Sequence, residues 1–125
     1  MIKLTLPYPP TANHLKTALV IRGRARMVKS ATARNYAAEV AAIVQAANIQ
    51  PITDGDIELL IVVYRPRKVG DLDNCIKIIQ DSMKGGVFAD DKQITAIHAY
   101  RRDDKANPRV EVQLCRVETG GLLLP

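Results

Sequence analysis

Two groups of charged side chains, one on each side of a predicted helix, have the residue types and spacing for chemistry. Asp71 and Asp73 stand where extended chain enters the helix, and Lys77 follows one helical turn later. Asp90 and Asp91 come after the helix has ended. The two-residue spacing can place the carboxylates of Asp71 and Asp73 on one side, roughly 6 to 7 Å apart along the backbone. Acids gathered in this way could hold a cation.

Clustered carboxylates beside a lysine suit the hydrolysis of a phosphodiester bond. This reaction places negative charge on the attacking water and on the leaving oxygen, and Mg²⁺ held by carboxylates stabilises both. Without a metal, converging carboxylates repel one another and some would take up protons. The acids are therefore a candidate metal site, in which Lys77 could orient the nucleophile or stabilise the transition-state phosphate.

Each acid also has an ordinary structural explanation. Asp71 and Asp73 suit a helix N-terminus, where they would act as caps or as partners of the helix dipole. An ion pair between Asp73 and Lys77 would contribute only about 0.3 to 0.5 kcal/mol. Asp90 and Asp91 could form a turn or a cap before the next strand. The spacing alone leaves metal binding and capping open.

The apolar pattern predicts the elements that position these acids. Along the chain they are a strand at 2–6, a short hairpin at 19–28 turning near Gly23, a helix at 31–47, a strand at 57–64, a helix at 72–84, and strands at 93–101 and 109–117. Ser30 is the expected N-cap of the first helix, and strand 57–64 is apolar enough for the centre of a sheet. The last two strands are predicted to pair as a terminal hairpin.

This order of elements predicts the α+β class. We expect a single domain over residues 1–118, with a mixed β-sheet packed against two main helices, and a C-terminal tail at 119–125. The 125 residues are 47% hydrophobic and 25% charged, as in an ordinary globular domain. No apolar stretch approaches the roughly 20 residues of a membrane span. We expect a cytoplasmic protein without membrane contact, in which Cys75 and Cys115 are reduced thiols.

Basic residues gather in the first third of the chain. The formal net charge is +5, and residues 1–38 hold seven lysines and arginines but no aspartate or glutamate. Such a cluster suits a polyanion, because each cation that neutralises a phosphate releases condensed counterions; the alternative is a solvated basic face. The candidate DNA-contacting residues are Lys16, Arg22, Arg24, Arg26, Lys29 and Arg34.

The acid-rich segments resemble those of the RusA family of Holliday-junction resolvases. Residues 71–74 (DLDN) with Lys77 are similar to the family's DLDN…K signature, and residues 90–94 (DDKQI) to its DDxQ(V/I) signature. Residues 4–10 (LTLPYPP) with Asn13 are similar to the family's opening strand and LPxPPxxN loop. The likeness extends from Ile2 to about Val117.

The resemblance implies that Asp71, Asp73 and Asp91 are the metal-binding carboxylates and that Lys77 is the catalytic lysine, with Asp90 as a further metal candidate. It implies Mg²⁺, for which Mn²⁺ could substitute, and cleavage of four-way junctions in DNA recombination and repair. We expect a homodimer, because a junction with approximate two-fold symmetry must be nicked on two strands. Two alternatives stay open: the same chemistry on flaps, forks or structured RNA, and a non-catalytic nucleic-acid-binding module.

Overall fold

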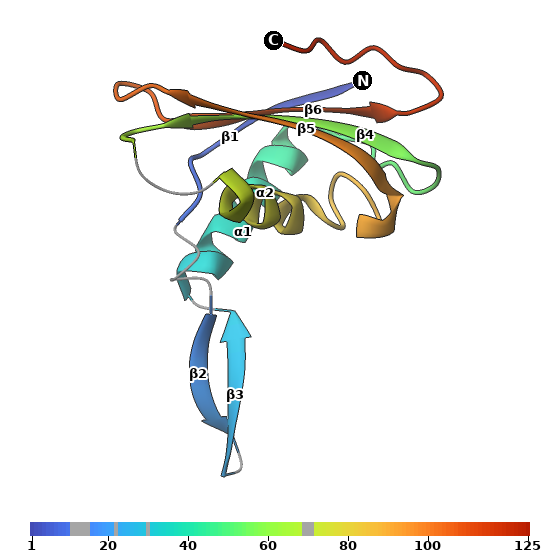
Figure 1. Cartoon of the computed structure of the whole chain (residues 1–125). Coiled ribbons are helices and arrows are strands. Elements are labelled where there is room, and N and C mark those ends of the chain that lie inside the picture. The colour runs from blue at the N-terminus through green and yellow to red at the C-terminus, as the bar shows by residue number, and fades with distance from the viewer. Residues whose placement is uncertain (11–15, 22, 30, 69–71) are drawn as a thin grey trace.

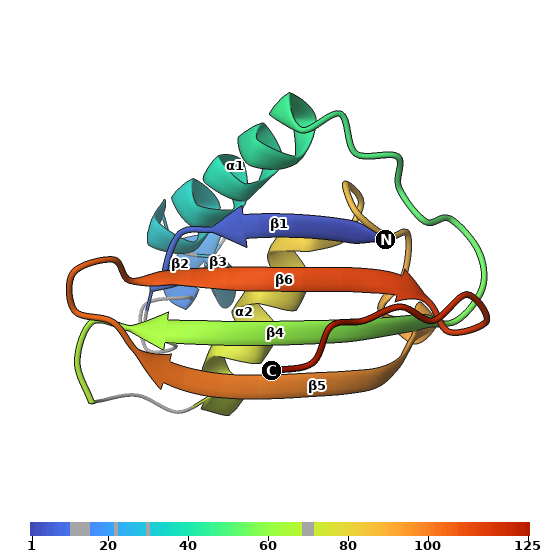
Figure 2. The ribbon, with the colours of Figure 1, turned by 90° about the horizontal axis from the view of Figure 1, so that it is seen from above.

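A mixed four-stranded sheet with two helices against one of its faces forms the body of the molecule (Figures 1 and 2). The computed structural model describes residues 1–10, 16–21, 23–29, 31–68 and 72–125, with the backbone alone for 16–21 and 26–29. The sheet order is β1-β6-β4-β5, and β2 and β3 form a separate hairpin. The elements are β1 (Ile2–Leu6), β2 (Lys16–Ile21), β3 (Arg24–Lys29), α1 (Ala31–Ala46), β4 (Ile57–Arg65), α2 (Leu72–Met83), the 3₁₀ turn η2 (Asp91–Gln93), β5 (Ile94–Asp103) and β6 (Arg109–Arg116). The predicted α+β class, with a mixed sheet and two helices, is confirmed.

Strand β4 lies in the interior of the sheet, as its apolar sequence predicts. It pairs antiparallel with β6 on one side and parallel with β5 on the other. Alternate residues, among them Leu59 and Ile61, belong to the main core, while Leu60 and Val62 between them are also buried. A strand with apolar residues on both faces is most stable in an inner position of the sheet. There both faces are covered and the backbone groups on both edges are hydrogen-bonded.

The predicted pairing of the last two strands is wrong. Strands β5 and β6 are not neighbours, because β4 lies between them and pairs with both. The reason is burial: β5 is partly or fully exposed along its whole length and takes the sheet edge, whereas β4 needs cover on both faces. The connection at 104–108 therefore joins two strands that both flank β4.

Helix α1 packs against the sheet through one stripe of its surface. Tyr36, Val40 and Val44 recur every fourth residue and are buried, so they lie on the same face of the helix. The Tyr36 hydroxyl donates a hydrogen bond to the carbonyl oxygen of Pro7 at 2.9 Å. This bond ties the helix to the chain that leaves β1. The predicted N-cap, Ser30, lies outside the described residues.

The β2–β3 hairpin projects away from the body on the helix side of the sheet (Figure 1). Its antiparallel register runs from Lys16 opposite Lys29 to Ile21 opposite Arg24. Gly23 lies in the two-residue connection with φ 76°, a backbone region in which glycine is unstrained. The predicted hairpin is thus present, and it extends over residues 16–29 rather than the predicted 19–28.

After β6 the chain turns back across the outer face of the sheet, opposite the helices (Figure 2). The backbone N–H of Leu123 donates to Oε1 of Gln113 at 3.1 Å. Neither cysteine forms a disulfide within the described residues: Cys75 is half-buried, and Cys115 is buried, which raises the pKa of the Cys115 thiol. No helix in the described part of the chain is long and apolar enough to cross a bilayer.

Candidate active site beside α2

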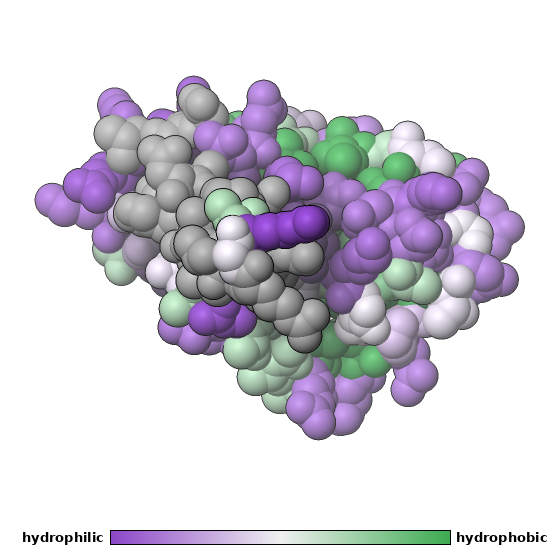
Figure 3. All heavy atoms as spheres, turned by 90° about the horizontal axis from the view of Figure 1, so that it is seen from below, coloured by the Kyte–Doolittle hydropathy of each residue, from purple (hydrophilic) through white to green (hydrophobic). Residues whose placement is uncertain are grey.

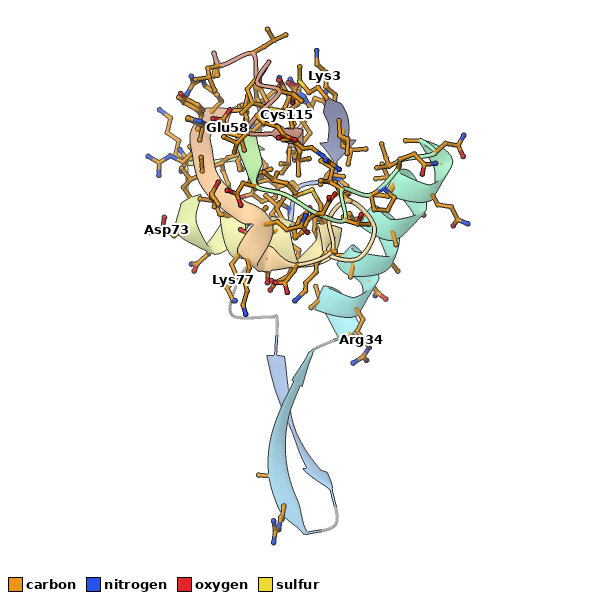
Figure 4. The ribbon with its side chains drawn as sticks, turned by 90° about the vertical axis from the view of Figure 1, so that its right-hand side faces the viewer. Lys3, Arg34, Glu58, Asp73, Lys77 and Cys115 are labelled. Atoms are coloured by element: carbon orange, nitrogen blue, oxygen red, sulfur yellow. The ribbon has the colours of Figure 1, made fainter. Side chains whose placement is uncertain are left out.

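Helix α2 separates an apolar face from a charged one, which is why it can line a cleft while it stays anchored. Ile79 and Met83 are fully buried in the core. Asp73, Lys77 and Asp81, at successive i, i+4 positions, are exposed on the other face. Figure 4 shows Asp73 and Lys77 pointing outward from the helix. Helix α2 is therefore amphipathic, with its charged residues on the exposed face.

A cleft of about 250 Å³ lies along this charged face. It is lined by Asp73, Ile76, Lys77, Gln80, Asp81 and Asp91. Three of the predicted site residues, Asp73, Lys77 and Asp91, are thus brought together although they span two elements. The fourth, Asp71, lies outside the described residues. Gln80 and Asp81 also line the cleft. Asp81 belongs with Asp73 and Lys77 to the polar stripe that helical spacing predicts, and the same spacing from Lys77 could have identified Gln80.

The backbone that carries Asp91 is fixed at several points between α2 and η2. Phe88 is fully buried. Its carbonyl accepts from the N–H of Gly85 at 2.7 Å, and the N–H of Val87 donates to the carbonyl of Met83 at 2.9 Å. The N–H of Ile52 donates to the carbonyl of Val87 at 2.9 Å. The connection is therefore tied both to the end of α2 and to the segment before β4.

Asp90 and Gln93 build the turn that presents Asp91. Oδ1 of Asp90 accepts from the backbone N–H of Lys92 at 3.0 Å, so Asp90 is the N-cap of η2. Oε1 of Gln93 accepts from the N–H groups of Ala89 and Asp90, each at 2.9 Å. The two halves of a capping box are therefore present, and Asp90 is not among the cleft-lining residues. The capping explanation holds for Asp90, while its neighbour Asp91 reaches the cleft.

Gln93 also fastens the turn to the rest of the protein. Its Nε2 donates to the carbonyl of Ile52 at 3.1 Å and to that of Gly55 at 3.3 Å. One side chain thus links η2 to the segment that leads into β4. This bracing gives the glutamine of the DDKQI segment a structural role distinct from that of the acids.

The two carboxylate oxygens of Asp91 have different surroundings. Oδ2 lies 3.6 Å from Nζ of Lys84. Oδ1 is buried and has no hydrogen-bond partner among the described residues. A buried carboxylate oxygen without a partner is costly, because it loses hydration without compensation. A cation would relieve this cost, and the hard oxygen donors of Asp73 and Asp91 are those that Mg²⁺ prefers.

Lys77 pairs with Asp81 rather than with Asp73. Its Nζ lies 3.9 Å from Oδ2 of Asp81, and 76% of the Lys77 side chain is exposed. The pair is exposed enough that it contributes little to stability. An ammonium group so accessible is free to meet a bound phosphate.

The described residues alone do not form a complete metal site. No group of three His, Cys, Asp or Glu side chains within them is close enough to hold an ion. Asp73 and Asp91 supply two acids of the predicted set, and the third, Asp71, is the one that falls outside. The donors present fit a divalent cation by chemistry and by the unpartnered oxygen of Asp91.

The basic candidates lie on the hairpin and at the start of α1. Arg24, on the hairpin, and Arg34, in the first turns of α1, are exposed. Lys16, Arg26 and Lys29 lie in β2 and β3, where the backbone alone is described, and Arg22 is outside the described residues. Figure 4 places Lys77 and Arg34 on the side of the body from which the hairpin projects. On that side, hydrophilic residues cover much of the surface that Figure 3 colours by hydropathy.

Comparison with known proteins gives one family. The model of the family described as Endodeoxyribonuclease RusA matches residues 7–115 of the 125-residue chain. This span contains both acid-rich segments, the cleft and the hairpin. No individually curated protein matches the sequence.

Proposed function

Because the chain belongs to the RusA family of endodeoxyribonucleases, whose members resolve Holliday junctions, we propose that it cuts four-way junctions by Mg²⁺-dependent hydrolysis, with one nick from each protomer of a homodimer. The observation that carries the proposal is the convergence of Asp73, Lys77 and Asp91 in one cleft, where an oxygen of Asp91 is buried and unpartnered.

The roles of the residues follow from their chemistry. Asp73 and Asp91, with Asp71 as the third acid, would hold Mg²⁺, which supplies a nucleophilic water and offsets charge on the scissile phosphate. Lys77 lies beside the acids with its ammonium group exposed, so it can contact a non-bridging phosphate oxygen and stabilise the charge that grows there. Asp81 would keep that ammonium group at the cleft through its i, i+4 contact.

The basic hairpin would grip DNA around the branch point. The chain from 1 to 38 carries no acid, so nothing within it offsets the positive charge of β2 and β3. A two-stranded ribbon is narrow enough to enter the major groove of B-DNA, and lysines and arginines along it would neutralise phosphates. Lys16, Arg22, Arg24, Arg26, Lys29 and Arg34 are the proposed DNA contacts.

The dimer follows from the symmetry of the substrate. Each chain has one such cleft among its described residues, and a four-way junction must be cut on two strands of like polarity. A two-fold dimer presents two identical sites, so paired symmetric nicks would result.

The test is cleavage of a labelled synthetic four-way junction with and without Mg²⁺, with Mn²⁺ as a second ion. Asp73→Asn should abolish cutting and still bind the junction when no metal is present. Asp56→Asn is the matched control, because Asp56 is exposed and does not line the cleft, and it should cut normally. Retained Mg²⁺-dependent cutting by pure Asp73→Asn protein would refute the assignment.

A panel of substrates tests the junction specificity separately. Flaps, forks, duplexes and structured RNA should be cut far more slowly than the four-way junction. Equal cutting of flaps or forks would leave the chemistry in place and overturn the proposed target.

A further inference from the structure

A lysine at the end of α2 contacts the carboxylate of Asp91 from outside the set of cleft-lining residues. Lys84 follows Met83, the last residue of the helix, and its Nζ lies 3.6 Å from Oδ2 of Asp91. Both side chains are about half exposed, at 48% for Lys84 and 43% for Asp91. Such a pair on an open surface contributes little to stability. Because the pair lies beside the cleft, its effect on the Asp91 carboxylate matters more than its effect on stability.

The backbone fixes the distance that the Lys84 side chain must span. Residue 84 forms a parallel bridge with Phe88, and Phe88 is fully buried. The N–H of Gly85 donates to the Phe88 carbonyl. Asp91 follows three residues later on the capped turn, so the two side chains start from anchored points. The backbone of the turn therefore favours the contact between the two side chains.

We infer that Lys84 is a positioning residue for Asp91, which holds Oδ2 and so keeps Oδ1 for a divalent cation. The inference rests on the proposed function. Carboxylates that bind metals are commonly held by outer partners on their second oxygen, and the loss of such partners weakens metal binding. Here Oδ2 has the lysine, and Oδ1 has no hydrogen bond within the described residues. Without Lys84, the carboxylate could rotate and hydrate both oxygens.

The sign of one mutational effect separates positioning from simple electrostatics. Replacing Lys84 by Met keeps most of the side-chain length and removes the charge. If the lysine acted only through its positive field, its loss would strengthen the binding of a cation. If it positions Asp91, its loss should weaken binding. The two explanations predict opposite shifts.

The experiment measures Mn²⁺ binding to the full chain in the absence of DNA. The concentration of unbound Mn²⁺ is read from its electron paramagnetic resonance signal. We expect Lys84→Met to weaken Mn²⁺ binding about tenfold, and Lys84→Arg to stay within about twofold of wild type, because it keeps a cation within reach. Lys92→Met is the matched control: Lys92 is exposed, is adjacent to Asp91 and has no ion pair among the described residues. It should not weaken binding.

A double mutant shows whether the effect passes through Asp91. In an Asp91→Asn background, Lys84→Met should cause no further loss. Unchanged or tighter Mn²⁺ binding by Lys84→Met, or an equal loss in both backgrounds, would overturn the role of Lys84 while the proposed nuclease stands. Absence of Mn²⁺ binding by the wild-type protein would instead overturn both. Unchanged thermal unfolding of Lys84→Met excludes a loss of folding as the cause.

Discussion

Gln93 offers a quantitative test of how the turn holds the site. Its side chain accepts two backbone hydrogen bonds within the turn and donates two more to the carbonyls of Ile52 and Gly55. Three of the four bonds are exposed. The net contribution of one hydrogen bond to stability is about 0.5 to 1.5 kcal/mol. Because most of these bonds are exposed to water, we take a value near the lower end of this range for each. Gln93→Ala should lower the free energy of unfolding by about 2 to 3 kcal/mol.

The assay is unfolding in urea, monitored by circular dichroism. A chelator is present so that metal binding does not contribute to the stability. With a slope of about 2 kcal/mol per molar urea, the midpoint should fall by about 1 M without a change in slope. Gln50→Ala, at an exposed glutamine before β4, is the control and should change the free energy of unfolding by less than about 0.5 kcal/mol. A loss below about 0.5 kcal/mol for Gln93→Ala would refute the bracing of η2 by Gln93.

Three further outcomes follow from the structure. Lys77→Met should lower the single-turnover cleavage rate by about 100-fold or more, with junction affinity nearly unchanged, because the role proposed for its exposed ammonium group is to stabilise charge on the scissile phosphate; an equal loss of affinity and rate would contradict this. Phe88→Ala should cost about 3 to 5 kcal/mol in urea unfolding, since Phe88 is fully buried, and a smaller cost would mean that the turn can collapse into the space. Arg24→Ala should reduce the slope of log Kd for the junction against log salt by about 1, as expected for one lost phosphate contact, whereas Lys105→Ala, in the loop between β5 and β6, should leave the slope unchanged.

Helix α2 and its polar face could be predicted from the sequence because the pattern is local. Asp73, Lys77 and Asp81 recur at helical spacing on the exposed face, and the buried residues of the helix, Ile78, Ile79 and Met83, lie on the other face. The glycines after Met83 likewise mark the end of the helix: Gly85 has φ 92°, which favours glycine over other residues.

The pairing of β5 could not be predicted from its own residues. A strand shows its periodicity in the sequence, but its neighbours depend on which other strands need burial on both faces. Short separation along the chain favoured a hairpin with β6, yet β4 requires the inner place and takes both as partners. Competition between strands decides the order, and no single stretch contains that information.

The different roles of Asp90 and Asp91 could not be predicted from the sequence either. In sequence both residues are acids before a strand. In space Asp90 caps the turn through the N–H of Lys92, and Asp91 lines the cleft. The contact between Lys84 and Asp91 depends on the conformation of the intervening turn, so spacing could not reveal it.

Both ends of the chain lie on the side of the sheet away from the helices (Figure 1). An affinity tag or a fluorophore attached at Met1 or Pro125 would extend from that side, with the sheet between it and the acids of α2. Immobilising the protein through either end on a sensor chip should therefore leave the helix side free to receive a bulky branched duplex.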